Sequence, residues 1–373
     1  MNELTEAPSF MLSCVWFVIG LSMIVLTLSD GFSFILMSRK RENRNGFSMW
    51  IERIYWRIFR FVLLRTKRLQ IRERLFTMYT PMVILTLLIT WATSLIYGFA
   101  LLSWSFGEEL KGSIHEPRFA DYVYLSGVTF FTLGYGDLSP AENFGKFFSL
   151  IEVGCGYSFL AAIVGFIPTI ASIYSERELG LLRIEMQTGE NFSATGALYR
   201  MIPSRDMANI NVFFRECNDW LLKLHLSQVC YPVLCYQRYS SQSVNWLKGV
   251  SVLLDLSAIS LAWMELEDDR AVSNLYHHGT RTLQQFNDLF WLDPASEPRS
   301  TRVSREKCLR LWDNLHQMGF PMRPLEDPVA AIEQYLGKYE LQLSALSDYL
   351  VMPLAEMTAD EIQPFTRYNL LDH

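Results

Sequence analysis

The sequence predicts an all-α membrane protein whose membrane part is followed by a helical soluble domain. Half of the 373 residues are hydrophobic and 14% are aromatic. Three stretches, 10–37, 81–106 and 144–174, are long and almost free of charge, and a bilayer span needs only about 20 apolar residues. From residue 176 onward, apolar residues recur at helical spacing with little strand alternation.

The first apolar stretch predicts a membrane helix over residues 1–37. It is too long for the core of a signal peptide, and no small-residue cleavage pattern follows it. Asp30 interrupts the run. A carboxyl at this depth is expected either to face a protein partner or to lie near the inner interface.

The distribution of charge predicts the topology. Residues 38–76 hold twelve Lys and Arg against three acidic residues, which is typical of a loop on the cytoplasmic side of a membrane. We therefore expect a multi-pass protein of the cell membrane, with an external N-terminus and a cytoplasmic C-terminus. Residues 176–373 are acidic, with 18 basic and 26 acidic residues, so no nucleic-acid partner is expected.

The basic segment, 38–78, contains an amphipathic pattern. Apolar residues recur at helical spacing among arginines, at Trp50, Ile54, Ile58, Phe61 and Val62. This pattern favours a helix that lies in the membrane interface. The alternative, a voltage sensor, needs arginines repeated inside a spanning helix, and the apolar run here is short for that.

An irregular segment lies between the second and third apolar stretches. Residues 119–131 are apolar and aromatic and predict a short helix, which ends at the sequence TLGYGD, residues 132–137. Gly and Asp are poor helix formers. Irregular backbone at membrane depth is tolerated only where it is buried in protein or lines a water-filled cavity.

The order of span, short helix, TLGYGD and span resembles the pore domain of potassium channels. The resemblance covers residues 80–172, about a quarter of the chain. It implies a pore domain over 79–175, with an outer helix, a pore helix, a selectivity filter and an inner helix. Because one chain supplies one filter strand, the resemblance also implies a homotetramer in membrane lipid, with K⁺ as the permeant ion and no cofactor.

The resemblance assigns roles to the residues of the motif. The filter would be Thr132–Gly136, in which the carbonyl groups of Thr132, Leu133, Gly134 and Tyr135 coordinate K⁺. Gly134 and Gly136 permit the dihedral angles that this requires. At the outer mouth, Asp137 is expected to form a hydrogen bond with Tyr124. The family more often has valine or isoleucine at Leu133 and threonine at Phe131, and both side chains are expected to pack behind the filter.

The inner helix carries further candidates. Gly156 is expected to be a hinge, or else a glycine needed for close helix packing, and Leu160, Val164 and Pro168 would line the cavity and the gate. Glu152 would lie behind the filter, either as a functional group or as a protonated, hydrogen-bonded structural one.

Residues 176–373 predict a cytoplasmic helical bundle. Apolar residues from Ile332 to Leu350 predict one long helix. The apolar stretch 246–263 contains Lys248 and Asp255, which favours a helix buried in the bundle over a fourth span. No glycine-rich nucleotide motif and no catalytic pairing is recognised, so no enzyme is expected. His225, Cys230 and Cys235 are close in sequence but share no helical face, which favours buried or idle side chains over a zinc site.

The sequence therefore predicts a potassium-selective homotetrameric channel that is gated through its cytoplasmic domain by an unidentified ligand or partner. The first alternative is a weakly selective cation channel, because of Leu133. The second is a membrane-anchored sensor or scaffold that does not conduct.

Overall fold

The computed structural model describes residues 10–35, 46–66, 68–113, 115–188, 192–201, 207–237, 245–294, 302 and 304–357. The chain forms two compact units. The first combines residues 1–65 with 78–172, and the second combines 66–77 with 173–373.

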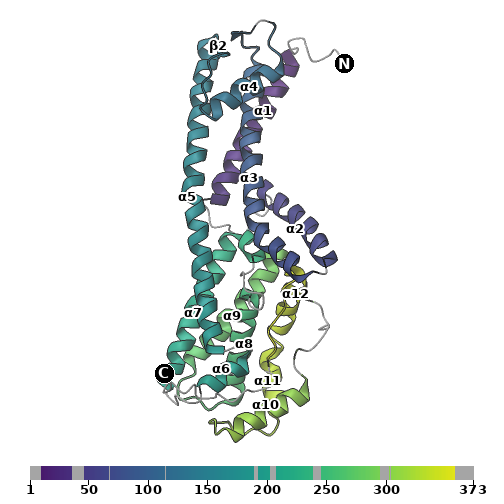
Figure 1. Cartoon of the computed structure of the whole chain (residues 1–373), viewed down its shortest axis with the longest axis vertical. Helices are drawn as coiled ribbons and strands as arrows, with labels where there is room; N and C mark the ends of the chain where they lie inside the picture. Colours follow the sequence, from purple (N-terminus) through teal and green to yellow (C-terminus); the bar gives the residue numbers. More distant parts are fainter. Residues whose placement is uncertain are drawn as a thin grey trace, which may run out of the picture. The chain divides into compact units, whose positions relative to one another are not determined.

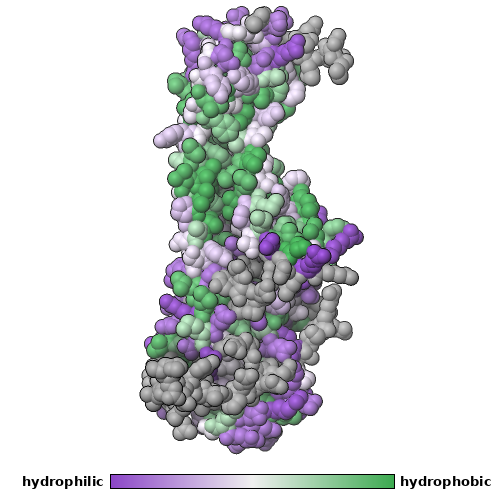
Figure 2. Space-filling model, in the orientation of Figure 1, coloured by the Kyte–Doolittle hydropathy of each residue, from purple (hydrophilic) through white to green (hydrophobic). Residues whose placement is uncertain are grey.

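The first unit is built from long apolar helices (Figure 1). Its elements are α1 (Phe10–Ile35), α2 (Phe47–Arg65), α3 (Leu69–Ser105), β1 (Leu110–Lys111), α4 (Phe119–Phe130), β2 (Ser139–Pro140) and α5 (Asn143–Thr188). Helices α1, α3 and α5 are long and apolar enough to cross a membrane, and Figure 2 shows hydrophobic residues gathered around the middle of this region, with hydrophilic residues at the top of the view. The structure therefore agrees with an all-α membrane protein.

Two of these helices extend beyond their apolar stretches. Helix α3 begins at Leu69 and passes through Pro81, and α5 continues past residue 174 to Thr188. The added turns contain Arg, Glu and Leu, which favour helix regardless of hydropathy. Hydropathy locates the part of a helix that faces lipid, but it does not locate the end of the helix.

Helix α1 packs closely against α3 where two glycines meet. A Cβ added at Gly20 would lie 2.8 Å from the carbonyl oxygen of Gly98, and one added at Gly98 would lie 2.7 Å from Ile24. Small residues let membrane helices approach in this way, because association in lipid depends on close packing. A hydrogen bond of 2.8 Å between Thr27 and Ser94 adds to the contact.

Asp30 joins three helices of this unit. Its carboxylate accepts hydrogen bonds from the Ser48 backbone N–H (3.1 Å) and the Ser48 hydroxyl (3.0 Å) at the start of α2. It also accepts one from the Trp91 indole N–H of α3 (2.9 Å). Of the two expectations for Asp30, contact with protein is therefore observed.

Helix α2 has one buried face and one exposed face. Met49, Trp56 and Leu63 are buried, and Trp56 packs edge-on against Tyr79 of α3. Trp50 and Phe61 are more than half exposed. An exposed apolar face is what an interfacial helix needs, and the interfacial placement itself stays a prediction.

The second unit is a helical bundle around α8. It contains the last turns of α5 together with α6 (Ala194–Met201), α7 (Met207–Cys230), η2 (Pro232–Tyr236), α8 (Trp246–Trp263), α9 (Arg270–Phe290), α10 (Arg305–Gln317), α11 (Pro328–Leu336) and α12 (Glu340–Leu350). Almost every residue of α8 is buried, and α8 contacts α6, α9, α11 and α12. The prediction that residues 246–263 are buried in the bundle is therefore confirmed.

A charged cluster explains how α8 carries Asp255 in its buried interior. Arg302 donates two hydrogen bonds of 2.9 Å to the fully buried carboxylate of Asp255 and two, of 2.8 and 2.7 Å, to Glu340. The Tyr339 hydroxyl donates a further bond of 2.7 Å to Asp255. Burial, together with the nearby Asp255 carboxylate, raises the pKa of Tyr339 well above its usual value, so the hydroxyl keeps its proton.

The prediction of one long helix from Ile332 to Leu350 is wrong. Helix α11 ends at Leu336, Gly337 caps it, and α12 begins at Glu340. Tyr339 lies in the break, with φ of −133° and ψ of −19°. The break lets the Tyr339 hydroxyl reach Asp255, a tertiary requirement that the hydrophobic period does not show.

The residues weighed for zinc have other partners. His225 forms a hydrogen bond of 3.1 Å with Thr282, and the Cys235 thiol donates one of 3.4 Å to Gln228. Within the described ranges, no group of three or more His, Cys, Asp or Glu residues could hold a metal ion.

Replacing Arg302 by Met should destabilise the second unit strongly. The change leaves the carboxylate of Asp255 buried without its cation, which typically costs about 3–5 kcal/mol. Arg305→Met is the matched control, because Arg305 pairs with Asp327 at 3.2 Å on the exposed surface, and such pairs contribute about 0–1 kcal/mol. Denaturant unfolding of the purified full chain, followed by tryptophan fluorescence, measures both, and equal losses would contradict the role given to Arg302.

Candidate ion-conduction site

The candidate site begins with the short helix α4, which has a defined start and a defined end. At its start, the Arg118 backbone N–H donates to the carboxylate of Asp121 (2.7 Å), as in a capping box. At its end, the Thr132 N–H donates to Thr129 O (3.0 Å) and the Leu133 N–H donates to Val128 O (2.9 Å). These bonds fix the first residues of the TLGYGD segment to the last turn of the helix.

Backbone conformation alternates along this segment. Thr132, Gly134 and Gly136 have φ values of 55°, 60° and 76°, whereas Leu133 and Tyr135 between them do not have positive φ. A change of sign at every residue rotates successive peptide planes so that their carbonyl groups turn to the same side. The segment can therefore present a row of carbonyl oxygens, which is the arrangement that coordinates a dehydrated cation.

The two glycines and Thr132 bear this conformation at different cost. Glycine adopts positive φ without penalty. For a residue with a Cβ, the left-handed region costs about 1–2 kcal/mol, and Thr132 carries this cost. Strain of this kind persists where neighbouring structure holds it and is often found at functional sites.

The segment is exposed within a single chain. Residues 131–137 are all exposed, including Phe131 at 59%, Leu133 at 54% and Tyr135 at 68%. The expectation that Phe131 and Leu133 pack behind the filter is therefore not met by contacts within one chain. Large apolar side chains gathered in this way indicate a surface that is covered by another molecule.

Contacts with neighbouring loops hold the outer end of the segment. The Tyr124 hydroxyl donates a hydrogen bond of 2.8 Å to the Asp137 carboxylate, which is the contact expected from the sequence. Gly112, with φ of 96°, approaches so closely that an added Cβ would lie 1.8 Å from Asp137 O. Directly after the segment, β2 pairs antiparallel with β1, which lies before α4 in the chain.

Behind α4, one serine connects three helices. The Ser126 hydroxyl lies 2.8 Å from Ile96 O of α3 and forms a hydrogen bond with the carboxyl of Glu152 on α5. Ser126 has a single proton to donate, and a backbone carbonyl can only accept. Both contacts are satisfied at once when Glu152 is protonated and donates to the Ser126 oxygen. The sequence left two roles open for Glu152, a functional one and a protonated structural one, and this geometry fits the structural role. The part of Glu152 in supporting the filter stays a prediction.

Gly156 lies against the C-terminal end of α4. A Cβ added there would lie 2.2 Å from Phe130 O, whereas one added at Gly154 would meet nothing within 4 Å. Of the two readings of Gly156, the close-packing one is therefore observed in the structure, and its role as a hinge stays a prediction.

Three further α5 candidates face away from the rest of their own chain. Leu160 and Val164 are 58% and 65% exposed, and Pro168 is exposed as well. The helix continues through Pro168 without interruption. Exposure in one chain is compatible with a cavity or with lipid, so the assignment to a gate stays a prediction.

Two residues of this site were missed by sequence reasoning. The sequence does not mark Ser126 as a site residue, because a single serine in a short helix is common. Gly112 lies in the loop before α4, about 25 residues from its contact at Asp137. Only the positive φ of Gly112 and its distance from Asp137 show why glycine stands there.

Together, two long apolar helices, the short helix between them and the alternating φ of Thr132–Gly136 are the features of an ion-channel pore domain. Comparison with known families agrees, because residues 81–172 match the family model described as "Ion channel". The resemblance of this segment to the potassium-channel pore domain is therefore confirmed.

Among curated proteins, the chain is similar to the uncharacterized membrane protein YdjJ of Bacillus subtilis (strain 168). The two are 22% identical over 182 residues, which cover 48% of this chain and 52% of that protein. The match thus spans about half of either sequence. No solved structure matches the chain.

Gly156→Ala should destabilise the first unit. The new methyl group would overlap Phe130 O, and overpacking of this kind costs about 1–3 kcal/mol. Gly154→Ala, two residues earlier on the same helix, is the control and should leave stability unchanged or slightly raised. Thermal unfolding of the purified chain in detergent compares the two, and equal behaviour would show that α4 and α5 are not in close contact.

Replacing Glu152 separates hydrogen bonding from charge. Glu152→Gln keeps a donor and an acceptor for Ser126 and should be nearly neutral. Glu152→Ala leaves a cavity and an unsatisfied hydroxyl, which costs about 1–3 kcal/mol. The same unfolding assay measures both variants. If Glu152→Gln lowers stability as much as Glu152→Ala does, the hydrogen bond to Ser126 does not account for the contribution of Glu152.

Proposed function

We propose that the protein is a potassium-selective channel formed by four copies of this chain. The observation that carries the proposal is the alternation of φ over Thr132–Gly136, directly after a short helix between two spans. A dehydrated K⁺ ion needs its water shell replaced by oxygen atoms, and rings of backbone carbonyls supply them. In this arrangement the carbonyls of Thr132, Leu133, Gly134 and Tyr135 would bind the ion.

The geometry of one chain supports an assembly of several copies, and the resemblance to potassium channels implies that the number is four. A single strand of carbonyls can contact an ion from one side only, so a closed ring requires several copies related by rotation. The exposed side chains of Phe131, Leu133 and Tyr135 offer the surface that such neighbours would cover. Leu160, Val164 and Pro168 would then face the central cavity below the filter.

The proposal places the chain in the cell membrane with its N-terminus outside and its C-terminus in the cytoplasm. Support comes from the basic residues before α3, which are typical of the cytoplasmic side. The exposed apolar face of α2, with Trp50 and Phe61, would then lie in the inner leaflet.

Gating is proposed to act through the continuation of α5. The helix runs without a break from Asn143 to Thr188, and its last turns are built into the second unit. There the Trp220 indole donates to Arg177 O (3.0 Å), and the buried Arg177 guanidinium donates to Leu234 O (2.8 Å). A continuous helix transmits movement, whereas a flexible linker would lose it. Movement of the bundle would therefore reach α5 near Pro168 and Gly156.

Gly134→Val should abolish conduction. Thr132 already carries the cost of a β-branched residue at positive φ, and valine at 134 would add a second such cost in the same short segment. The alternating conformation is then expected to be lost, although an added Cβ would meet no atom of its own chain within 4 Å. Gly154→Ala, in α5, is the control and should conduct. The measurement is current through planar bilayers that contain the purified protein, with a K⁺ gradient.

Selectivity is read from the same recordings. The reversal potential of the parent protein should follow the potassium equilibrium potential. A reversal potential that is equally sensitive to Na⁺ would favour a weakly selective cation channel, the class that Leu133 in the filter suggests. Absence of current from correctly assembled parent protein would favour a membrane-anchored sensor or scaffold.

A further inference from the structure

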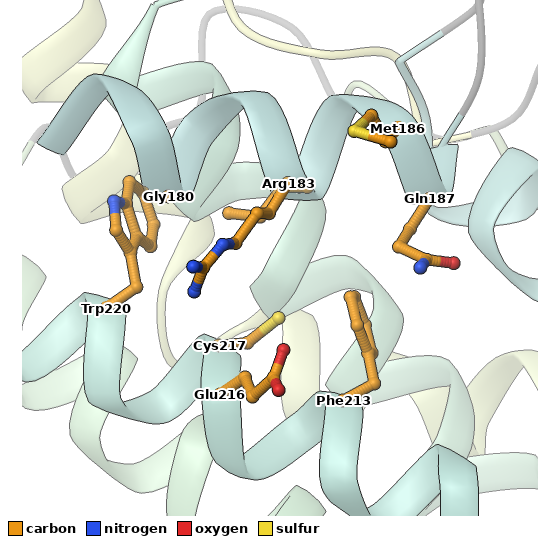
Figure 3. A pocket seen from close by; sticks show the side chains of 9 residues that line it. Gly180, Arg183, Met186, Gln187, Phe213, Glu216, Cys217 and Trp220 are labelled. Atoms are coloured by element: carbon orange, nitrogen blue, oxygen red, sulfur yellow. The ribbon is translucent and has the colours of Figure 1, made fainter. Parts of the chain in front are cut away.

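A pocket lies in the second unit where the last turns of α5 pass over α7 (Figure 3). Its volume of about 340 Å³ lies at the lower end of the range for small-molecule sites. Its lining combines apolar, aromatic and charged side chains from both helices, namely Gly180, Arg183, Ile184, Met186, Gln187, Phe213, Glu216, Cys217 and Trp220.

Trp220 forms one end of the pocket and holds the two helices together. A Cβ at Gly180 would lie 1.9 Å from the Trp220 ring, so only glycine lets the indole pack there. The indole N–H is already used, because it donates to Arg177 O. Trp220 therefore presents only its apolar ring to the pocket, and the buried side chains of Ile184 and Cys217 form the rest of the apolar floor.

Two opposite charges line the same pocket without neutralising each other. Arg183 comes from α5 and Glu216 comes from α7 (Figure 3). Within the described part of the chain, neither forms an ion pair or a hydrogen bond with the other or with any other residue. A cation and an anion that face one cavity and remain apart suit a ligand that carries both charges.

We propose that this pocket binds a small zwitterion with an apolar body, namely an α-amino acid with a hydrophobic side chain. Its carboxylate would pair with Arg183, since guanidinium and carboxylate match in shape and charge. Its ammonium would pair with Glu216. Its side chain would lie against Trp220 and the floor at Ile184 and Cys217, where apolar surface leaves water.

Other ligand classes fit the lining less well. A carboxylic acid without the amine would bring a second negative charge toward Glu216, and an amine without the acid would bring a positive charge toward Arg183. Like charges at close range oppose binding. The combination of both charges therefore decides the ligand class.

Binding here would act on the conduction pathway, a consequence that rests on the proposed function. The ligand would bridge α5 and α7, and α5 is the same helix that would line the pore. A ligand can shift a conformational equilibrium only by binding its states with different affinity. If α5 and α7 separate or rotate on gating, the shape of the pocket changes, and the ligand then binds the two states with different affinity.

Isothermal titration calorimetry on the full chain in lipid nanodiscs tests the binding. The probes are L-leucine, L-methionine and L-phenylalanine, with 3-phenylpropionate and phenethylamine as analogues of phenylalanine that lack one charge. At least one amino acid should bind saturably, and the matched analogues should bind at least ten times more weakly. Arg183→Gln and Glu216→Gln should each weaken the amino acid at least tenfold.

Two neighbours on α7 provide matched controls. Arg215→Gln and Asp219→Asn remove exposed charges that do not line the pocket, and they should leave binding unchanged. The proposal is overturned if no amino acid binds, as expected when a neighbouring copy fills the pocket. It is also overturned if the single-charge analogues bind equally well, or if the control variants weaken binding as much as the pocket variants.

A flux measurement separates this proposal from the proposed function. In vesicles, the bound amino acid should change the K⁺ flux of the parent protein, and Arg183→Gln should keep basal flux but lose the response. Absence of basal flux with intact binding would count against the channel and not against the site. Intact flux and binding without any response would overturn the regulatory role.

Discussion

The left-handed backbone at Thr132, Gly134 and Gly136 is the constraint on which the first unit depends. Thr132 pays about 1–2 kcal/mol for this conformation, and the exposed segment gains little packing from its own chain. The conformation is held from three directions instead. The last turn of α4 bonds to Thr132 and Leu133, Tyr124 bonds to Asp137, and Gly112 lies against Asp137 O. Helix α4 must therefore be held firmly itself.

The support of α4 explains why polar groups and glycines occur inside the membrane part. Ser126 ties α4 to Ile96 O on α3 and to Glu152 on α5, and Gly156 lets α5 touch Phe130 O. Helix association in lipid gains nothing from hydrophobic contact alone, so position must come from hydrogen bonds and close packing. Asp30 does for α1, α2 and α3 what Ser126 does for α3, α4 and α5.

The sequence predicted what depends on local pattern and missed what depends on distant contacts. The apolar stretches located α1, α3 and α5, and the glycines of the TLGYGD motif indicated where the backbone adopts positive φ, because both signals lie in adjacent residues. The charged residues within 246–263 correctly indicated a helix buried in the bundle and not a fourth membrane span. Its partner Arg302 could not be named, because it lies 47 residues away in a stretch without periodic pattern. The break before Tyr339 was missed for the same reason, since the hydrophobic period continues across it.

The second unit shows how a helix can leave the membrane and still be part of a folded domain. The end of α5 is not a free extension, because Trp220 packs on Gly180 and Arg177 is buried among the carbonyls of Leu234 and Gln237. Burying a guanidinium is costly unless its donors are used, so these bonds fix the position of α5 within the bundle. Helix α7 is joined to α5 by the Trp220 indole N–H, which donates to Arg177 O, so a rearrangement of α7 must displace α5 or break this bond. The proposed ligand pocket is lined by residues of these same two helices, so a ligand bound there would favour one arrangement of α5 and α7 over another.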